Sequence, residues 1–218
     1  MSAPRALVFD LDGTLVDSSA DLAAAINRTR AELGREPLAT EAVVGMVGEG
    51  ARRLVAKAID GLEGEALDRA VARFLALYEP VCAVETRPYP GIPELLAAEA
   101  ARRPLALLTN KPERMSRRIL EAFGWRQIFV EVIGGDSLPV RKPDPGGLAW
   151  IAARLGLELP ELALVGDTRI DADTAAAAGC RFVWVEWGFA QPRDREALGR
   201  FPRAATTAEL ARRLAELG

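Results

Sequence analysis

The sequence contains no histidine, and this absence removes several classes of catalysis from consideration. Ser-His-Asp and Cys-His hydrolysis, imidazole acid–base chemistry and histidine metal ligands all need a residue that the chain lacks. Its two cysteines, Cys82 and Cys180, are too few and too far apart for a zinc site or a disulfide framework. Any catalytic acid, base or ligand is therefore drawn from Asp, Glu, Lys, Tyr or Cys.

Lysine is scarce and long apolar runs are missing. Only Lys57, Lys111 and Lys142 are lysines among 28 basic residues, which are balanced by 31 acidic residues to a net charge of −3. This balance gives no reason to expect nucleic-acid binding. No stretch approaches the ~20 apolar residues of a membrane span, and the N-terminus lacks a signal-peptide pattern. We expect a cytoplasmic monomer or small homo-oligomer with no nucleic-acid or membrane partner.

What the sequence does contain is a series of short apolar runs that alternate with helical patterns. Five runs have the composition of strands buried on both faces: Ala6–Phe9, Leu105–Leu108, Val130–Ile133, Ala163–Val165 and Phe182–Val185. Helical patterns cover residues 92–101, 114–122, 146–155 and 171–178, and a closing helix is expected at 206–217. This alternation predicts an α/β fold with a doubly wound, Rossmann-like parallel-sheet core.

The interval after the first expected strand is too long for a single strand–helix–strand step. Asp10 and Thr109 are 99 positions apart, whereas one such step takes ~30 residues. The residue pattern in this interval is typical of helices. It predicts a first helix that is capped by Ser18 and ends at Gly34, followed by helices at 40–46, 50–59 and 63–78. We therefore expect a small helical cap domain over residues 16–84, and a core domain made of residues 1–15 and 85–218.

Polar and acidic residues follow the expected strands at the edge of the sheet where α/β proteins bind ligands. Asp10 and Asp12 follow the first strand, and two acids so close together repel each other unless a cation or ligand offsets their charge. The corresponding positions along the chain hold Thr109 and Asn110, then Lys142, then Asp167 and Asp171. Each group alone has an ordinary explanation as a turn, a helix cap or a solvated charge. Their common position favours a site.

Four acids, one lysine and an anion-binding turn suit Mg²⁺ and a phosphoryl group. Mg²⁺ prefers oxygen ligands and takes few of them from the protein. An aspartate carboxylate can attack phosphorus, and a nearby lysine and metal can offset charge on the transferring oxygens. The sequence thus indicates phosphoryl-transfer chemistry on a small phosphoester.

These motifs, taken in order, resemble those of the haloacid dehalogenase-like superfamily of phosphatases. They are Asp10-Leu11-Asp12-Gly13-Thr14, Leu107-Leu108-Thr109-Asn110, Lys142, and Gly166-Asp167 through Asp171. The resemblance spans essentially the whole chain, and the long first interval matches the family's helical cap. It implies Asp10 as nucleophile and Asp12 as general acid and base. Asp12 also argues against the dehalogenase branch, which lacks that second acid.

The resemblance further implies the ligands of the substrate and of Mg²⁺. Thr109 and Lys142, with Asn110, would hold the phosphoryl group. Asp10, the backbone carbonyl of Asp12 and Asp167 would bind Mg²⁺, and Asp171 would orient metal-bound water or Lys142. Within the superfamily the chain resembles bacterial phosphoglycolate phosphatases in segments such as Val47-Gly48-Glu49-Gly50-Ala51, Thr109-Asn110-Lys111-Pro112 and Val165-Gly166-Asp167-Thr168-Arg169-Ile170-Asp171. The usual serine after Gly-Asp is Thr168 here.

Substrate choice is expected to come from the cap. The glycine-rich loop 45–53 turns into a helix, and its N–H groups together with Arg52 or Arg53 are candidates to bind a substrate carboxylate. The alternative is that the glycines are hinge or packing positions and the arginines are solvated. Lys57 raises the separate idea of a Schiff-base lysine, against which stands its expected place on a polar helix face.

The leading functional hypothesis is a Mg²⁺-dependent phosphatase that hydrolyses 2-phosphoglycolate. A second is a related phosphatase for another small ester, such as pyrophosphate or a sugar phosphate, or a sugar-phosphate mutase. A third, from a different class, is a non-catalytic protein that binds a phospho-ligand. The natural sign of that class is loss of Asp10 or Asp12, and both are present.

Overall fold

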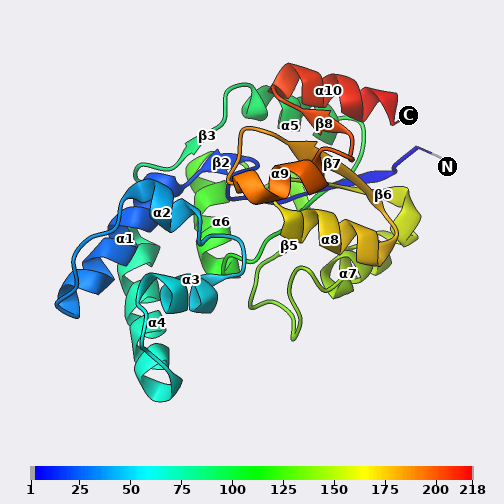
Figure 1. Ribbon diagram of the computed structural model, residues 1–218. Coiled ribbons are helices and arrows are strands. Elements are labelled where there is room, and N and C mark those ends of the chain that lie inside the picture. The colour runs from blue at the N-terminus through cyan, green and yellow to red at the C-terminus, as the bar shows by residue number, and fades with distance from the viewer. Residues whose placement is uncertain (1–2, 218) are drawn as a thin grey trace.

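The computed structural model describes residues 3–217, in which six strands form one parallel sheet (Figure 1). The strands lie in the order β5-β4-β1-β6-β7-β8, and every neighbouring pair is parallel. Their bounds are β1 Ala6–Phe9, β4 Leu105–Leu108, β5 Phe129–Ile133, β6 Leu162–Gly166, β7 Arg181–Val185 and β8 Arg203–Ala204. The chain leaves β1 toward β4 and β5 and later returns to β6 on its other side. The order of the strands therefore reverses at β1.

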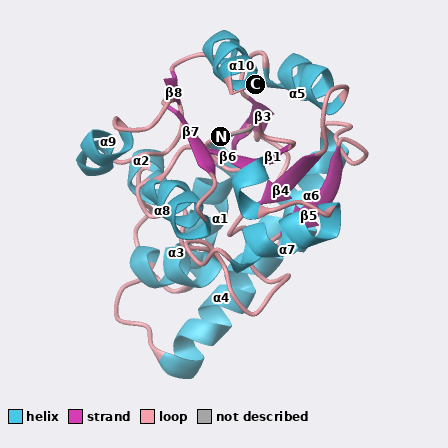
Figure 2. Ribbon diagram, turned by 90° about the vertical axis from the view of Figure 1, so that its right-hand side faces the viewer, coloured by secondary structure: helices cyan, strands magenta, loops and turns pink. Residues whose placement is uncertain are grey.

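Helices cover both faces of the sheet, which confirms the predicted doubly wound fold. Alternate residues of β1 enter two separate apolar clusters: Leu7 and Phe9 in one, Ala6 and Val8 in the other. The first cluster includes side chains of α5, α6 and α10, the second those of α7 and α8. Figure 2 shows α5 and α10 on one side of the sheet and α7 and α8 on the other. The bounds are α5 Ile92–Ala100, α6 Glu113–Ala122, α7 Gly146–Leu155, α8 Arg169–Ala178, α9 Pro192–Leu198 and α10 Thr207–Glu216, with a short 3-10 turn η2 at Leu159–Glu161.

Four helices gather to one side of the sheet in the long interval after β1 (Figure 1). They are α1 Ser19–Glu32, α2 Thr40–Val44, α3 Ala51–Ala58 and α4 Gly64–Tyr78, followed by the 3-10 turn η1 Glu79–Val81. α1 packs on α2 and α4, and α3 packs on α4. We call these four helices the cap. The division into a core of residues 1–15 and 85–218 and a cap of residues 16–84 stays a prediction.

A two-stranded antiparallel ribbon connects the cap to the sheet. It consists of β2 Val16–Asp17 and β3 Arg87–Pro88, and the sequence did not reveal it, because two-residue strands carry no periodic pattern. Beside the ribbon, the buried carboxylate of Asp21 on α1 accepts hydrogen bonds from the backbone N–H groups of Glu85 and Thr86 and from the Thr86 hydroxyl. The chain thus enters and leaves the cap at one fixed place.

Other local predictions were corrected. Ser18 was expected to cap the first cap helix, but it makes no side-chain cap hydrogen bond. Its hydroxyl instead donates to Asp12 at 2.5 Å, since the β1 loop brings a carboxylate into reach. β5 was expected to be buried on both faces, but it is an edge strand, and Val130 is 57% exposed.

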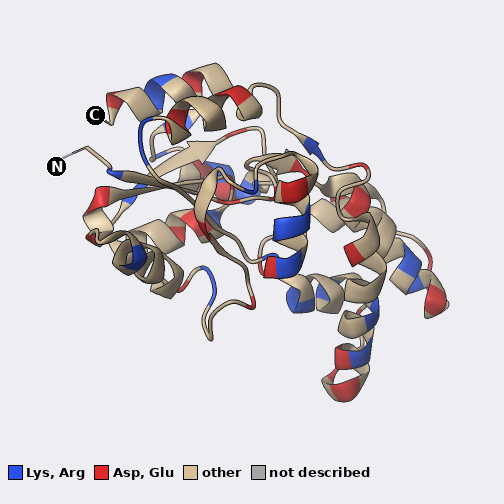
Figure 3. Ribbon diagram, turned by 180° about the vertical axis from the view of Figure 1, so that it is seen from behind, with Lys and Arg blue, Asp and Glu red and all other residues tan. Residues whose placement is uncertain are grey.

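Charged residues of both signs are interspersed on the helices in the view of Figure 3. Many ion pairs join exposed side chains, for example Arg73 with Glu32 at 2.6 Å. No helix within residues 3–217 is long and apolar enough to cross a membrane.

Candidate active site

Two aspartates emerge from the carboxyl end of β1, the central point at which the strand order reverses. Asp10 directly follows the strand, its backbone N–H donates to Val165 on β6 at 3.0 Å, and its Oδ1 accepts from Leu11 N at 2.7 Å. The chain then turns at Gly13, whose φ is 79°. A Cβ at Gly13 would overlap the Asp167 carboxylate, so only glycine fits there. The turn therefore brings the β1 loop against the β6 loop.

Lys142 lies between Asp10 and Asp171 and contacts both carboxylates. Its Nζ lies 3.0 Å from Asp10 Oδ1 and 2.6 Å from Asp171 Oδ1, and all three side chains are buried. Burial alone would lower the pKa of Lys142, but the two carboxylates outweigh it and raise the pKa above its ordinary value. The lysine is therefore a fixed positive charge beside Asp10.

The positive charge of Lys142 does not fully offset the cost of burying the ionised carboxylate of Asp10. Burial raises its pKa from 3.8 to about 6, against the opposing effect of Lys142, and the Asp171 charge adds to the increase. A carboxylate held near a cation but out of water is only weakly solvated. Such a group is well placed to act as a nucleophile toward an electrophile that enters the site.

Asp167 follows β6 and is completely buried. Thr14 Oγ1 donates to its Oδ1 at 2.9 Å and Phe189 N to its Oδ2 at 2.6 Å. Burial, together with the charges of Asp171 and Asp10, raises the pKa of Asp167 well above its ordinary range. More positive charge is needed here than Lys142 alone supplies.

Three buried carboxylates have the arrangement and chemistry of a divalent cation site. Asp10, Asp167 and Asp171 each offer an oxygen, and these atoms lie within 4.8 Å of one another. Asp171 is the least free of the three, because one oxygen pairs with Lys142 and the other accepts the N–H and hydroxyl of Thr168 at the start of α8. The oxygen donors and the raised pKa values of Asp10 and Asp167 fit Mg²⁺.

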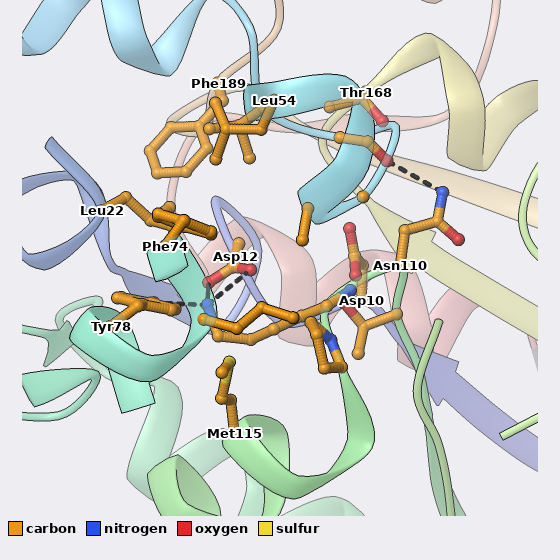
Figure 4. Close-up of a pocket in the computed structure, with 18 residues that line it drawn as sticks. Asp10, Asp12, Leu22, Leu54, Phe74, Tyr78, Asn110, Met115, Thr168 and Phe189 are labelled. Atoms are coloured by element: carbon orange, nitrogen blue, oxygen red, sulfur yellow. Dashed lines mark hydrogen bonds and ion pairs between the residues drawn. The ribbon is translucent and has the colours of Figure 1, made fainter. Parts of the chain in front are cut away.

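Asp12 faces away from the carboxylate trio and toward the cap. Its carboxylate accepts from Ser18 and from Lys111, whose Nζ lies 2.9 and 3.0 Å from the two oxygens. The side chain is 11% exposed and lines the same pocket as Asp10. Figure 4 shows it between Asp10 and the cap residues Phe74 and Tyr78. Asp12 therefore presents its carboxylate to the same pocket as Asp10, and its acid–base role stays a prediction.

Thr109 and Asn110 lie at the end of β4, as the sequence predicted. Thr109 is 3% exposed and lines the pocket with Asp10. Both amide hydrogens of Asn110 are engaged, one with Gly48 O of the cap loop and one with Lys142 O, each at 2.8 Å. Asn110 therefore joins the cap loop to the Lys142 loop, and its binding of a phosphoryl group stays a prediction.

Arg52 and Arg53 do not line this pocket. Arg52 forms an ion pair with Asp68, and Arg53 lies 3.8 Å from Glu49, with side chains 48% and 70% exposed. Both lie on the outward face of α3, because Leu54, Val55 and Ala58 occupy the buried face. Lys57 is also outward and pairs with Glu49.

Sequence reasoning missed Lys111 as a site residue. It is 6% exposed and lies where the core meets the cap. Its Nζ donates to Asp12 and, at 2.6 Å, to the hydroxyl of Tyr78 at the end of α4. One signal was available: this lysine directly follows Thr109-Asn110 in a chain with only three lysines.

Comparison with known proteins agrees with this geometry. A family model of haloacid dehalogenase-like hydrolases matches residues 4–179. The phosphoglycolate phosphatase of Rhodospirillum rubrum is 43% identical over 197 residues, which are 86% of this chain and 82% of the relative. That of Chromobacterium violaceum is 39% identical over 94% of both chains. A crystal structure described as a predicted phosphoglycolate phosphatase from Haemophilus somnus is 30% identical, with a TM-score of 0.89 over 97% of this chain and 98% of that one.

A parallel sheet with a buried acid–lysine cluster at its switch point and a helical cap beside it is an arrangement suited to phosphoryl transfer. The chain belongs to the haloacid dehalogenase-like hydrolases. Within that family its similarity to phosphoglycolate phosphatases makes it a phosphoric monoester hydrolase.

Proposed function

We propose that this hydrolase converts 2-phosphoglycolate to glycolate and inorganic phosphate, with Mg²⁺ as cofactor and Asp10 as nucleophile. The observation that carries the chemistry is the contact of Asp10 with Lys142, 3.0 Å apart, at the base of a pocket that the cap covers. The substrate is supported by the similarity to phosphoglycolate phosphatases over most of the chain. The pocket's apolar cap side also suits a small ester.

In the first half-reaction Asp10 attacks the phosphorus, and the bond to the ester oxygen breaks. Asp12 gives its proton to that oxygen, and glycolate leaves. Lys142 stays beside Asp10 and offsets charge on the transferring phosphoryl oxygens, while Thr109 is placed to donate its hydroxyl to them. The product of this step is an acyl phosphate on Asp10.

In the second half-reaction water attacks the phosphorus of the aspartyl-phosphate. Asp12, now ionised, takes a proton from that water, and the Asp10 carboxylate leaves as phosphate forms. Asp10, the backbone carbonyl of Asp12 and Asp167 would hold Mg²⁺, and Asp171 orients Lys142. Bound Mg²⁺ supplies positive charge to the phosphoryl oxygens and to the crowded carboxylates.

The substrate assignment is tested by phosphate release from a panel of esters, each with Mg²⁺ and with EDTA. The panel holds 2-phosphoglycolate, pyrophosphate, hexose phosphates, nucleotides and 4-nitrophenyl phosphate. The proposal expects kcat/KM for 2-phosphoglycolate to exceed the others by at least about tenfold, or about 1.4 kcal/mol in transition-state binding. Metal-dependent activity led by another ester would overturn the substrate but leave the roles of Asp10 and Lys142 in place.

The role of Asp12 predicts a leaving-group effect. Asp12→Asn is expected to lower kcat/KM for 2-phosphoglycolate about 100- to 1000-fold, because glycolate must leave with a proton. The loss for transfer from 4-nitrophenyl phosphate is smaller, since nitrophenolate leaves without one. Rapid mixing should then show a burst of nitrophenol followed by slow turnover, because dephosphorylation still needs the base. Equal losses for both esters with no burst would contradict an acid–base role.

A further inference from the structure

The pocket contains a buried cation that the proposed reaction does not use. The Lys111 side chain is only 3% exposed, and its Nζ contacts both Asp12 oxygens and the Tyr78 hydroxyl. The ammonium also lies 4.6 Å from the centre of the Tyr78 ring. These two carboxylate contacts and the hydroxyl outweigh burial and raise the pKa of Lys111 above its ordinary value. In the free protein the buried ammonium thus has Asp12 as its anionic partner.

Lys111 is placed differently from the other buried lysine. Lys142 has two buried carboxylate partners at the base of the site, whereas Lys111 forms part of the wall where substrate must lie. Among the described residues that line this pocket, Lys111 is the only cation. The cap side is mostly apolar, and Figure 4 shows Leu22, Leu54 and Phe74 of the cap, together with Met115 of the core helix α6, around the pocket. Lys111 is therefore the described pocket residue that can form an ion pair with a second anionic group on a substrate.

The chemistry of a phosphorylated 2-hydroxy acid places its carboxylate next to this lysine. The carboxylate is separated from the ester oxygen by one carbon. Asp12 is the group that protonates that ester oxygen in the proposed reaction. A cation 2.9 Å from Asp12 is therefore also within reach of the substrate carboxylate. The outward arginines Arg52 and Arg53 do not line the pocket, so they offer no such contact.

We propose that Lys111 is the specificity-determining residue that binds the carboxylate of the substrate, assisted by the Tyr78 hydroxyl. The proposal rests on the proposed function and narrows it to phosphomonoesters with a carboxylate on the esterified carbon. Nζ donates to Asp12 in the free protein and to the substrate carboxylate in the complex, so the buried ammonium always has an anionic partner. The hydrogen bond between Lys111 and Asp12 is thus broken in the complex, which leaves Asp12 free to protonate the ester oxygen.

The ratio of kcat/KM for 2-phosphoglycolate to that for ethyl phosphate tests this role. Ethyl phosphate replaces the carboxylate by a methyl group, so any displacement of Asp12 affects both esters and cancels in the ratio. Lys111→Met is expected to lower the ratio about 10- to 100-fold, which is the range for one hydrogen bond to a charged group. Lys111→Arg, which keeps the charge, should restore part of it. Lys57→Met removes an exposed cap lysine and should leave the ratio unchanged.

An unchanged ratio in Lys111→Met would overturn the proposal, because Lys111 would then only position Asp12. If thermal unfolding shows that Lys111→Met is not folded, Tyr78→Phe provides the test of the proposal instead. Loss of this hydroxyl should raise KM for 2-phosphoglycolate at least about threefold more than KM for ethyl phosphate, and equal effects would overturn the proposal. A wild-type protein that does not prefer 2-phosphoglycolate to ethyl phosphate would instead contradict the proposed function itself.

Discussion

Asp10→Asn should reduce phosphate release from every ester by at least about 10⁴-fold, as expected when a covalent nucleophile is removed. A neutral amide cannot supply the electron pair that forms the acyl phosphate. The fold should persist, because the amide oxygen still accepts from Leu11 N and Lys142 keeps its partner Asp171. Thermal unfolding and phosphate assays on the same preparation test both statements. Near-wild-type activity would remove Asp10 as nucleophile.

Comparing Asp10→Asn with wild type in the absence of metal tests the pKa of Asp10 in the wild-type protein. Its pKa is raised from 3.8 to about 6, so the ionised carboxylate destabilises the folded protein above that pH. The folded state binds more protons than the unfolded state between these values, and stability falls as pH rises through this window. In EDTA, the free energy of unfolding of Asp10→Asn minus that of wild type should therefore grow by about 1–3 kcal/mol between pH 4 and pH 7. A flat difference would contradict the raised pKa.

Lys142→Met should affect both turnover and stability. Loss of the cation beside the transferring phosphoryl group is expected to lower kcat/KM by about 10³- to 10⁵-fold. The variant also leaves Asp10 and Asp171 buried without their partner, which costs about 3–5 kcal/mol of unfolding free energy. Urea unfolding in EDTA and phosphate release in Mg²⁺ measure the two effects.

Mg²⁺ should stabilise Lys142→Met more than it stabilises wild type. Without Lys142, no cation among the described residues pairs with the carboxylates of Asp10, Asp167 and Asp171, so a bound divalent ion relieves more repulsion. Arg141→Met removes the neighbouring exposed cation and is the matched control. Its stabilisation by Mg²⁺ is expected to differ from that of wild type by no more than about 0.5 kcal/mol. Equal stabilisation of variant and wild type by Mg²⁺ would contradict a shared metal and lysine site.

Much of the fold could be predicted because its core strands are short, wholly apolar and separated by regular helical patterns. β1 and β4 were predicted with the observed bounds, and α7 matches its predicted range. The β2–β3 ribbon and β8 escaped prediction, since each strand has two residues and exists through its pairing partner. The location of the site followed from the rule that parallel strands present their carboxyl ends at one edge.

The cap side of the site was harder to predict, because it depends on contacts between distant segments. Tyr78 and Lys111 meet across the boundary of cap and core, and no spacing in the chain indicates that contact. The outward position of Arg52 and Arg53 was accessible in principle. Helical periodicity places Leu54 and Val55 inward, and residues two positions earlier then lie on the opposite face.

Acid quenching during turnover of 2-phosphoglycolate tests the central claim most directly. Wild type and Asp12→Asn are quenched in Mg²⁺, digested and analysed by mass spectrometry for a covalent phosphoryl group. The account predicts that group on the peptide that contains Asp10, more of it in Asp12→Asn when 4-nitrophenyl phosphate replaces 2-phosphoglycolate, and none in Asp10→Asn or in EDTA. Turnover with no phosphorylated peptide, or with the phosphoryl group on a peptide without Asp10, would contradict the account.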